Sequence, residues 1–488
     1  MIIVLSYFPV FNNLGKFQIR MWDEASYANN SIDMLLTNQN IFVVEKQGKS
    51  DLYNTKPPFV IWLQALSMKL FGINELAIRL PSAIFGFLTI LLVYFFCTNV
   101  IGSKIIGFIS AGILLTAKGF VGNHVVRTGD LDAVLVFWLT LGLFAFIDLV
   151  IKKPKNSFYH FFILTISLTF GFLTKGIAGF FFVPFMFIIS VLFNNHKIFK
   201  EKYLYVSALI TAILCFGYYF IREILAPGYI NLVVESEILR YNHAIMSWQV
   251  HPFDYYYQNL KTSRFNPFFY ILPLTLINPF ILKSNKFLIS LYLSIAAVGY
   301  FLLISFPAVK LEWYDAPLFP ILSILIGLSF VETGLFIFRK LNIKWNLSLI
   351  KMILAVAAIL FLIKPYKEIL RSLKYPEEDI YSMEFDGAYL KYLKINRPDI
   401  KSLTVYKKEH NDALYDQVLF YIRAYEQQNN YHIRLTQEMN FQKNEIVMVC
   451  KQEDKEKLQA KYSVKEINNW KDGVIFQIVN RYPAETHM

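Results

Sequence analysis

Long apolar segments separated by short polar stretches make up the first three quarters of the chain. A membrane-spanning helix needs roughly 20 predominantly apolar residues, and ten segments meet this requirement. We expect them at about 76–97, 105–121, 131–151, 158–174, 177–193, 203–221, 265–282, 287–306, 316–337 and 347–364. The apolar run Met1–Phe11 is shorter than a full span. We interpret it as a short first helix, so the predicted total is eleven.

Basic residues gather in every second loop between these segments. With Met1–Phe11 counted as the first helix, the loops after the even-numbered helices hold one acid, Glu201, and twelve basic residues: Lys104, Lys152, Lys153, Lys155, Lys197, Lys200, Lys202, Lys283, Lys286, Arg339, Lys340 and Lys344. Positively charged loops stay on the cytoplasmic side of a membrane. The pattern therefore predicts a cytoplasmic N-terminus, with the long loops 12–75 and 222–264 and the C-terminal segment outside.

Two polar parts of the chain have element patterns of their own. In the loop 12–75, the stretches Glu24–Leu36 and Pro58–Leu70 are amphipathic, which is typical of helices lying in the membrane interface. In the C-terminal segment, strand-like runs alternate with helical ones, at Ser402–Val405, Asp416–Gln427, His432–Leu435, Glu445–Val449, Glu453–Lys461 and Val474–Val479. This alternation predicts a small α/β domain. We therefore expect an α-helical polytopic membrane domain at 1–364 and a soluble α/β domain at 365–488 on the outer face.

Composition excludes a soluble enzyme and a disordered chain. Of the 488 residues, 55% are hydrophobic and only 17% are charged, against about 25% charged in a typical soluble domain. Residues 365–488 contain 19 basic and 19 acidic residues, so the formal net charge of +12 resides in the first 364. Such a basic excess among apolar segments indicates cytoplasmic loops and not a nucleic-acid-binding surface. The three cysteines, Cys97, Cys215 and Cys450, have neither zinc nor disulfide spacing.

Polar residues at membrane level cluster on the predicted outer side. They form five motifs: Trp22-Asp23-Glu24, Asn54-Thr55-Lys56-Pro57-Pro58, Arg127-Thr128-Gly129-Asp130-Leu131-Asp132, Leu173-Thr174-Lys175-Gly176 and Lys310-Leu311-Glu312-Trp313-Tyr314. The loop 222–264 adds Arg240, His243, His251 and Arg264. Ionisable groups at this depth are costly and usually functional. Because all of them lie on one side, we expect a shared polar cavity.

These motifs resemble those of the GT-C glycosyltransferases. The segments WDEASYANNSIDML, YNTKPPFVIWLQALSMKLFGINELAIRLPSAIFG, RTGDLDAVLVFW, LTKG and HPFDYYYQNL occur in this order within roughly residues 1–330. The chain looks most like the dolichyl-phosphate-mannose protein mannosyltransferases and the bacterial enzyme that transfers aminoarabinose to lipid A. The resemblance implies a GT-C fold with its catalytic domain in 1–364. It also implies inverting transfer of a sugar from a polyprenyl-phosphate donor to an acceptor hydroxyl on the non-cytoplasmic face, here the periplasmic face of a bacterial inner membrane.

Such a transfer needs a carboxylate to orient and deprotonate the acceptor hydroxyl. The resemblance makes Asp23 the candidate base, although Asp23 could also cap the helix that follows it. Glu24 could assist Asp23 or lie on a solvated face. Asp132 is the candidate second carboxylate, or alternatively a helix N-cap. Asp130 lies two residues earlier and would point the other way on a helix, so we prefer Asp132.

The transfer also needs cations to hold the phosphate as its charge grows. Lys56 precedes two prolines that fix the local backbone, and it is the first candidate, with an interfacial lysine as the alternative. The resemblance adds four further donor-binding candidates: Arg240, Lys310, Lys175 and His251. Lys175 could instead anchor a tight turn, and His251 could be structural.

We expect neither a metal nor another cofactor. In the relatives that transfer aminoarabinose, a glutamate directly before Lys-Pro can bind zinc together with a histidine of the later loop. This chain has Thr55 at that position and a shifted His251, and a hydroxyl is a poor zinc ligand. The sequence therefore predicts transfer that survives chelation.

Two other functional classes stay as alternatives. A transporter or lipid flippase would have charges near the bilayer midplane and matching halves, neither of which this sequence shows. A structural scaffold would leave the clustered charges without a role. The expected partners are a polyprenyl-phosphate sugar donor, the membrane and an acceptor that could be lipid A, a glycan or a protein, with no nucleic acid.

Overall fold

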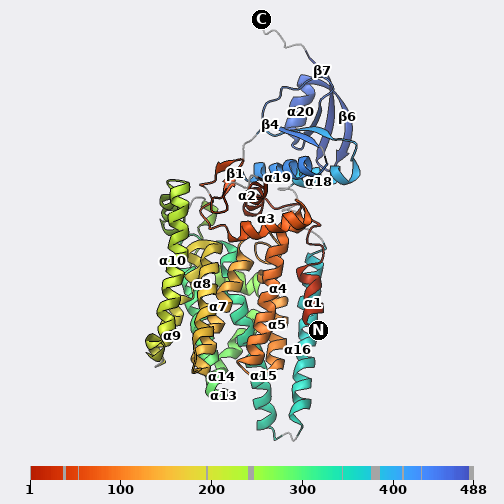
Figure 1. Ribbon diagram of the computed structural model, residues 1–488. Coiled ribbons are helices and arrows are strands. Elements are labelled where there is room, and N and C mark those ends of the chain that lie inside the picture. The colour runs from red at the N-terminus through yellow and green to blue at the C-terminus, as the bar shows by residue number, and fades with distance from the viewer. Residues whose placement is uncertain are drawn as a thin grey trace.

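A bundle of long helices forms one part of the molecule and a small α/β domain sits on one end of it (Figure 1). The structure is a computed structural model that describes residues 2–36, 40–52, 54–193, 196–239, 247–342, 345–374, 385–408, 412–429 and 431–482. We refer to the end of the bundle that carries the α/β domain as the domain-bearing end.

The long helices coincide with predicted membrane spans. Within the described ranges, seven helical segments are long and apolar enough to cross a membrane. They are α4 (Glu75–Asn99), α7 (Asp132–Lys152), α8 (Phe158–Lys175) with η1 (Gly176–Phe180), α10 (Lys202–Leu225), α14 (Ser284–Ser305), α15 (Leu318–Lys340) and α16 (Leu347–Ser372). The prediction of a polytopic helical membrane protein is therefore confirmed.

Three predicted spans are shorter or interrupted. They correspond to α5 (Lys104–Leu115) with α6 (Lys118–Val121), to α9 (Val183–Leu192) with an N-terminal proline, and to η7 (Phe268–Ile277) with α13 (Asn278–Ile281). Pro273 lies inside η7, and Pro279 follows at the start of α13. Proline removes a backbone donor and clashes with the preceding turn, which explains the 3₁₀ geometry there. The N-terminal run forms α1 (Ile2–Val10), short as predicted.

The long loop after α1 lies across the domain-bearing end (Figure 1). Its two amphipathic stretches form α2 (Asp23–Leu36) and α3 (Phe59–Phe71), close to the predicted bounds, with a hairpin of β1 (Glu45–Lys46) and β2 (Lys49–Ser50) between them. The remaining short elements are η2 (His196–Lys200), α11 (Tyr229–Val233), the π-helix η3 (Val234–Ile238), η5 (Ser247–Gln249), α12 (Tyr255–Asn259), the π-helix η6 (Leu260–Arg264) and η8 (Glu312–Asp315).

The C-terminal domain is a mixed sheet with helices, as predicted. Its strands are β3 (Ser402–Tyr406), β4 (His432–Thr436), β5 (Ile446–Val449), β6 (Tyr462–Trp470) and β7 (Gly473–Arg481), in the order β4-β3-β5-β7-β6. The central β3 runs parallel to β4 and β5, with Ser402 opposite His432 and Thr404 opposite Val447, while β7 is antiparallel to its neighbours. The helices are α18 (Phe385–Asn396), α19 (Asp412–Asn429) and α20 (Gln452–Lys461). The preceding α16 continues through Pro365 to Ser372, beyond the predicted boundary at 364.

One hydrophobic core joins the C-terminal domain to α2. Ala25, Ala28 and Ile32 of α2 are fully buried in the same cluster as Val418 and Tyr421 of α19. Removing this apolar surface from water stabilises the contact, by about 25 cal/mol for each Å². The α/β domain is therefore packed directly on the helix that begins with Asp23.

Candidate active site

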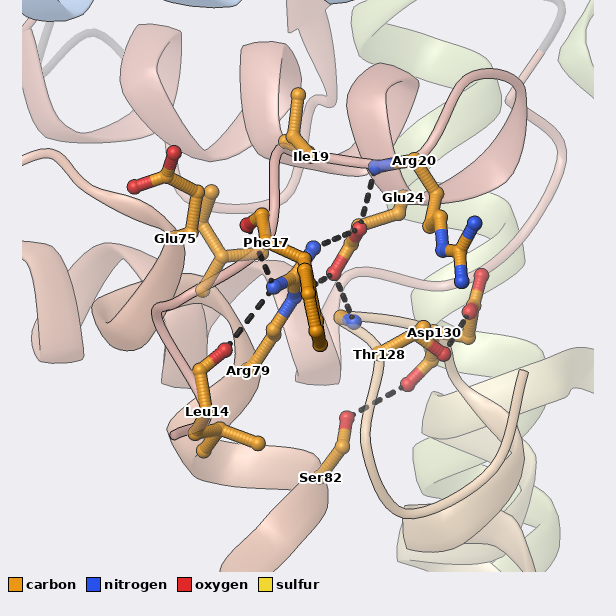
Figure 2. Close-up of polar contacts among 12 residues, drawn as sticks. Leu14, Phe17, Ile19, Arg20, Glu24, Glu75, Arg79, Ser82, Thr128 and Asp130 are labelled. Carbon is orange, nitrogen blue, oxygen red and sulfur yellow. Dashed lines mark hydrogen bonds and ion pairs between the residues drawn. The ribbon is translucent and has the colours of Figure 1, made fainter. Parts of the chain in front are cut away.

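The buried carboxylate of Glu24 joins three segments at the start of α2 (Figure 2). Arg79 of α4 donates to both of its oxygens, at 2.7 Å from Nε to Oε1 and 2.9 Å from Nη2 to Oε2. The backbone N–H groups of Gly129 and Arg20 also donate to it, at 2.7 and 2.6 Å. Glu24 is only 1% exposed, so its carboxylate holds the site together and has little access to a substrate.

Arg79 extends this network to the loop that precedes α2. Its guanidinium donates to the backbone carbonyls of Leu14, Phe17 and Gln18 at 2.9, 3.0 and 2.7 Å. The chain then turns at Trp22, whose φ of 67° is left-handed, and α2 begins at Asp23. A carboxylate in the first turn is favoured by the helix dipole. The local sequence thus both starts the helix and fixes the position of Asp23.

Asp23 faces two groups from the turn that leads into α7. The ligand atoms of Asp23, His124 and Asp130 all lie within 4.8 Å of one another. Asp130 accepts a hydrogen bond from the Thr128 hydroxyl, its Oδ2 lies 3.4 Å from His124 Nδ1, and its backbone oxygen accepts from Ser82 at 2.9 Å. The sequence predicted that Asp130 would point away from the site, whereas in the structure its carboxylate lies close to that of Asp23.

Charges in this group act on one another. Burial and the neighbouring Asp130 raise the pKa of Asp23 above its usual value. Burial alone would lower the pKa of His124, but Asp130, Asp23 and Asp132 together outweigh it and raise that pKa. The imidazole also stacks on Trp313 of η8, with 3.8 Å between ring centroids and 14° between planes. A raised pKa makes Asp23 a stronger base when it is ionised.

Asp132 and Lys175 form an ion pair beside Asp23. Lys175 Nζ, at the end of α8, lies 2.7 Å from Asp132 Oδ1, at the start of α7. Lys175 also lies over the ring of Tyr314, 5.1 Å from its centroid. Both charged groups act on the pKa of Asp23. The structure thus brings together three sequence-predicted residues, and Lys175 has a carboxylate partner that the sequence did not indicate.

Lys56 also has an unexpected carboxylate partner. Its Nζ lies 2.9 Å from Glu237 Oε1 in the π-helix η3. The Thr55 hydroxyl donates to the same oxygen at 3.3 Å. Glu237 could not be found from the sequence, because it is 181 residues from Lys56 and belongs to no recognisable motif.

Lys310 and His251 meet through the backbone. Lys310 Nζ donates to the carbonyl of His251 at 2.9 Å and to that of Pro307. Lys310 is 2% exposed, and burial lowers the pKa of its ammonium group. The His251 ring stacks on Tyr255, with 3.9 Å between centroids. Arg240 and His243 lie outside the described residues.

Among the residues that the structure describes, Asp23, His124 and Asp130 could hold a metal ion. Their spacing allows it, and Asp130 Oδ1 is buried without a hydrogen-bond partner, as a cation ligand would be. Neither Thr55 nor His251, on which the sequence-based prediction rested, belongs to this trio. No spacing in the sequence links His124 to Asp23, so the sequence alone did not indicate this trio.

The chain resembles several known proteins in sequence. Residues 55–219 match the family model described as dolichyl-phosphate-mannose-protein mannosyltransferase. An uncharacterized protein of Aquifex aeolicus is 26% identical over 64% of this chain and 60% of its own length. The undecaprenyl phosphate-alpha-4-amino-4-deoxy-L-arabinose arabinosyl transferase of Wigglesworthia glossinidia brevipalpis is 30% identical over 35% of this chain and 30% of its own length. The matches thus cover less than two thirds of these relatives.

Solved structures show the same fold over nearly the whole chain. ArnT from Cupriavidus metallidurans, solved with bound undecaprenyl phosphate, superposes with a TM-score of 0.66 at 16% identity, covering 97% of each chain. The oligosaccharyltransferase AglB from Archaeoglobus fulgidus, solved with an inhibitory peptide and a dolichol-phosphate, has a TM-score of 0.55 at 16% identity, covering 86% of this chain and 63% of its own. The chain therefore has the GT-C fold, and the resemblance drawn from the sequence motifs is confirmed.

Proposed function

We propose that this GT-C protein is an inverting glycosyltransferase that moves a sugar from a polyprenyl-phosphate donor to an acceptor hydroxyl. The observation that carries the proposal is the position of Asp23, beside the Asp132–Lys175 ion pair and next to His124 and Asp130. The family match and the ArnT structure with undecaprenyl phosphate support this donor class.

In this mechanism Asp23 accepts the proton of the acceptor hydroxyl. The acceptor oxygen forms a bond to the anomeric carbon from the side opposite the phosphate. The bond from that carbon to the phosphate oxygen breaks, and its electron pair leaves with the polyprenyl phosphate. No general acid is needed because the phosphate is already a good leaving group. Positioned cations stabilise the charge that develops on it.

Lys56 and Lys310 are the described cations proposed to contact that phosphate, and Arg240 and His251 are proposed with them. Lys310 Nζ donates to the carbonyls of His251 and Pro307, and these neutral groups do not cancel its positive charge, which can attract a phosphate. Lys175 is also proposed to help bind the donor. Its ion pair with Asp132 keeps both groups next to Asp23. Glu24 is proposed as a positioning residue, because four hydrogen bonds occupy its carboxylate.

The basic loops support an orientation in which the domain-bearing end faces the periplasm of a bacterial inner membrane. Asp23, Asp132 and Lys175 lie together at that end, so the transfer would occur there. The acceptor is a hydroxyl of lipid A, a glycan or a protein. A comparison of glycolipids and glycoproteins between a deletion strain and its parent identifies it.

The decisive test is transfer of a radiolabelled sugar in membranes that contain the protein. We expect transfer in membranes that also contain the polyprenyl-phosphate sugar synthase, and no transfer when the synthase is absent. With the synthase present, the Asp23→Asn variant should also lose transfer. Movement of a lipid-linked sugar across the membrane without any transfer would overturn the proposal in favour of a flippase.

A further inference from the structure

Glu237 is a buried carboxylate that the proposed mechanism does not use. Its side chain is 5% exposed, whereas that of its partner Lys56 is 25% exposed. The side chain of Lys56 is therefore partly exposed, while Glu237 Oε1 holds its ammonium at 2.9 Å. The pair combines a partly exposed lysine with an enclosed carboxylate.

Glu237 lies between the segment that contains Lys56 and the turn that follows Lys175. Ser236, its neighbour in η3, donates to the Thr55 hydroxyl at 3.1 Å, and Tyr229 donates to the Thr55 carbonyl at 2.6 Å. On the other side, a Cβ atom on Gly176, whose φ is +59°, would lie 2.6 Å from Glu237 Oε2. Glu237 thus contacts both the Lys56 turn and the turn directly after Lys175.

A phosphate cannot use Lys56 fully while Glu237 holds it. The ammonium has three donors, and a charge-assisted hydrogen bond to a carboxylate is about twice as strong as a neutral one. Glu237 lies in a π-helix, a local rearrangement of helical hydrogen bonding that is frequent at functional sites.

We propose that Glu237 is the counterion of Lys56 when no donor is bound, and that the phosphate of the polyprenyl-phosphate donor displaces it. This inference rests on the proposed function, because it takes Lys56 as a phosphate contact. Glu237 then sets the affinity for the donor and for the released carrier, since each must exchange one ion pair for another.

Glu237→Gln is the direct test, because it removes the charge and keeps the shape and a hydrogen-bonding oxygen for Thr55. The full chain, purified in detergent, is titrated with undecaprenyl phosphate. We expect the variant to bind roughly tenfold more tightly, the scale of one charge-assisted hydrogen bond. Unchanged or weaker binding would overturn the inference. Glu237→Ala removes the same carboxylate and should also tighten binding, so the test does not depend on one variant folding well.

Glu235 supplies a matched control. It lies in the same π-helix and is exposed, so Glu235→Gln removes the same charge from the same segment without touching Lys56. We expect its affinity for undecaprenyl phosphate to stay within twofold of the wild type. If Glu235→Gln and Glu237→Gln increased the affinity for undecaprenyl phosphate equally, the cause would be general repulsion between the segment and the phosphate. That result would contradict the specific pairing of Glu237 with Lys56.

A double-mutant cycle links the effect to Lys56. In a Lys56→Ala background, Glu237→Gln should no longer tighten binding by tenfold, because the counterion has lost its cation. Tightening of the same size in that background would overturn the inference. If the wild-type protein itself does not bind undecaprenyl phosphate, the proposed function fails. If it binds and the variants do not differ, only the role of Glu237 fails.

Discussion

Arg423 of α19 and Asp33 of α2 form an ion pair across 390 residues of sequence. Arg423 Nη1 lies 3.2 Å from Asp33 Oδ2, Nη2 donates to Oδ1, and Nη1 also donates to the Asn29 carbonyl at 3.1 Å. Two other side chains of α19 bind the backbone of Ile19: its N–H donates to the Tyr421 hydroxyl at 2.9 Å, and its carbonyl accepts from Gln417 at 2.6 Å. The C-terminal domain therefore holds the chain on both sides of Asp23.

Arg423→Ala should consequently slow transfer without removing any group from the site. Small displacements of a reacting group reduce rates strongly, so we expect kcat to fall roughly tenfold while KM for the donor changes little. Arg423→Lys should recover part of the loss. Arg434→Ala, which breaks the exposed pair with Glu445 in the same domain, is the control and should leave kcat unchanged. A lower kcat in both Arg423→Ala and Arg434→Ala would indicate general destabilisation of the domain.

Asp23→Asn should abolish most of the transfer while leaving donor binding intact. Loss of a positioned base typically costs about 10²-fold or more. Initial rates and undecaprenyl phosphate binding, measured on the same preparation, separate the two effects. Near-normal turnover would move the role of base to Asp132.

The rate of transfer should fall on acidification at a pH above the usual pKa of an aspartate, about 3.9. Asp23 acts as an ionised base, and its pKa is raised by burial and by Asp130, so protonation inactivates it earlier than usual. Asp130→Asn removes one negative charge and should shift the acidic limb of the pH–rate profile to lower pH. If the acidic limb of the profile stayed at the same pH in Asp130→Asn, a group other than Asp23 would control it.

Transfer should survive thorough chelation. Lys175 pairs with Asp132 and offsets the charge of one carboxylate without a metal ion. Purified enzyme is assayed with EDTA and then with added zinc, magnesium or manganese. Activity that is lost and then restored by one ion would assign Asp23, His124 and Asp130 as its ligands.

A reporter that is active only in the periplasm should work when fused after Met488 and fail when fused after Lys155. The five basic loops predict this arrangement. The reverse pattern would place Asp23 on the cytoplasmic side and contradict the proposed topology.

Membrane spans could be predicted from the sequence because transfer into a lipid bilayer depends on the apolar content of one continuous segment. This held for α4, α7, α8 and the other long helices, and the same local reasoning recovered α2 and α3. It was less accurate where proline interrupts an apolar run, as in η7, since hydropathy does not record backbone geometry.

Hydropathy and motifs were enough to predict the class of the protein, its apolar helices, the α/β tail and the segments that contain Asp23, Lys56, Asp132 and Lys175. Which charges form pairs became visible only in the folded chain. Arg79 forms an ion pair with Glu24, Lys56 with Glu237 and Arg423 with Asp33. The partners are 55, 181 and 390 residues apart in the sequence, respectively. A charge seen in sequence has no fixed partner, because ion pairs form between groups that packing brings within a few ångströms, and packing is a property of the whole fold.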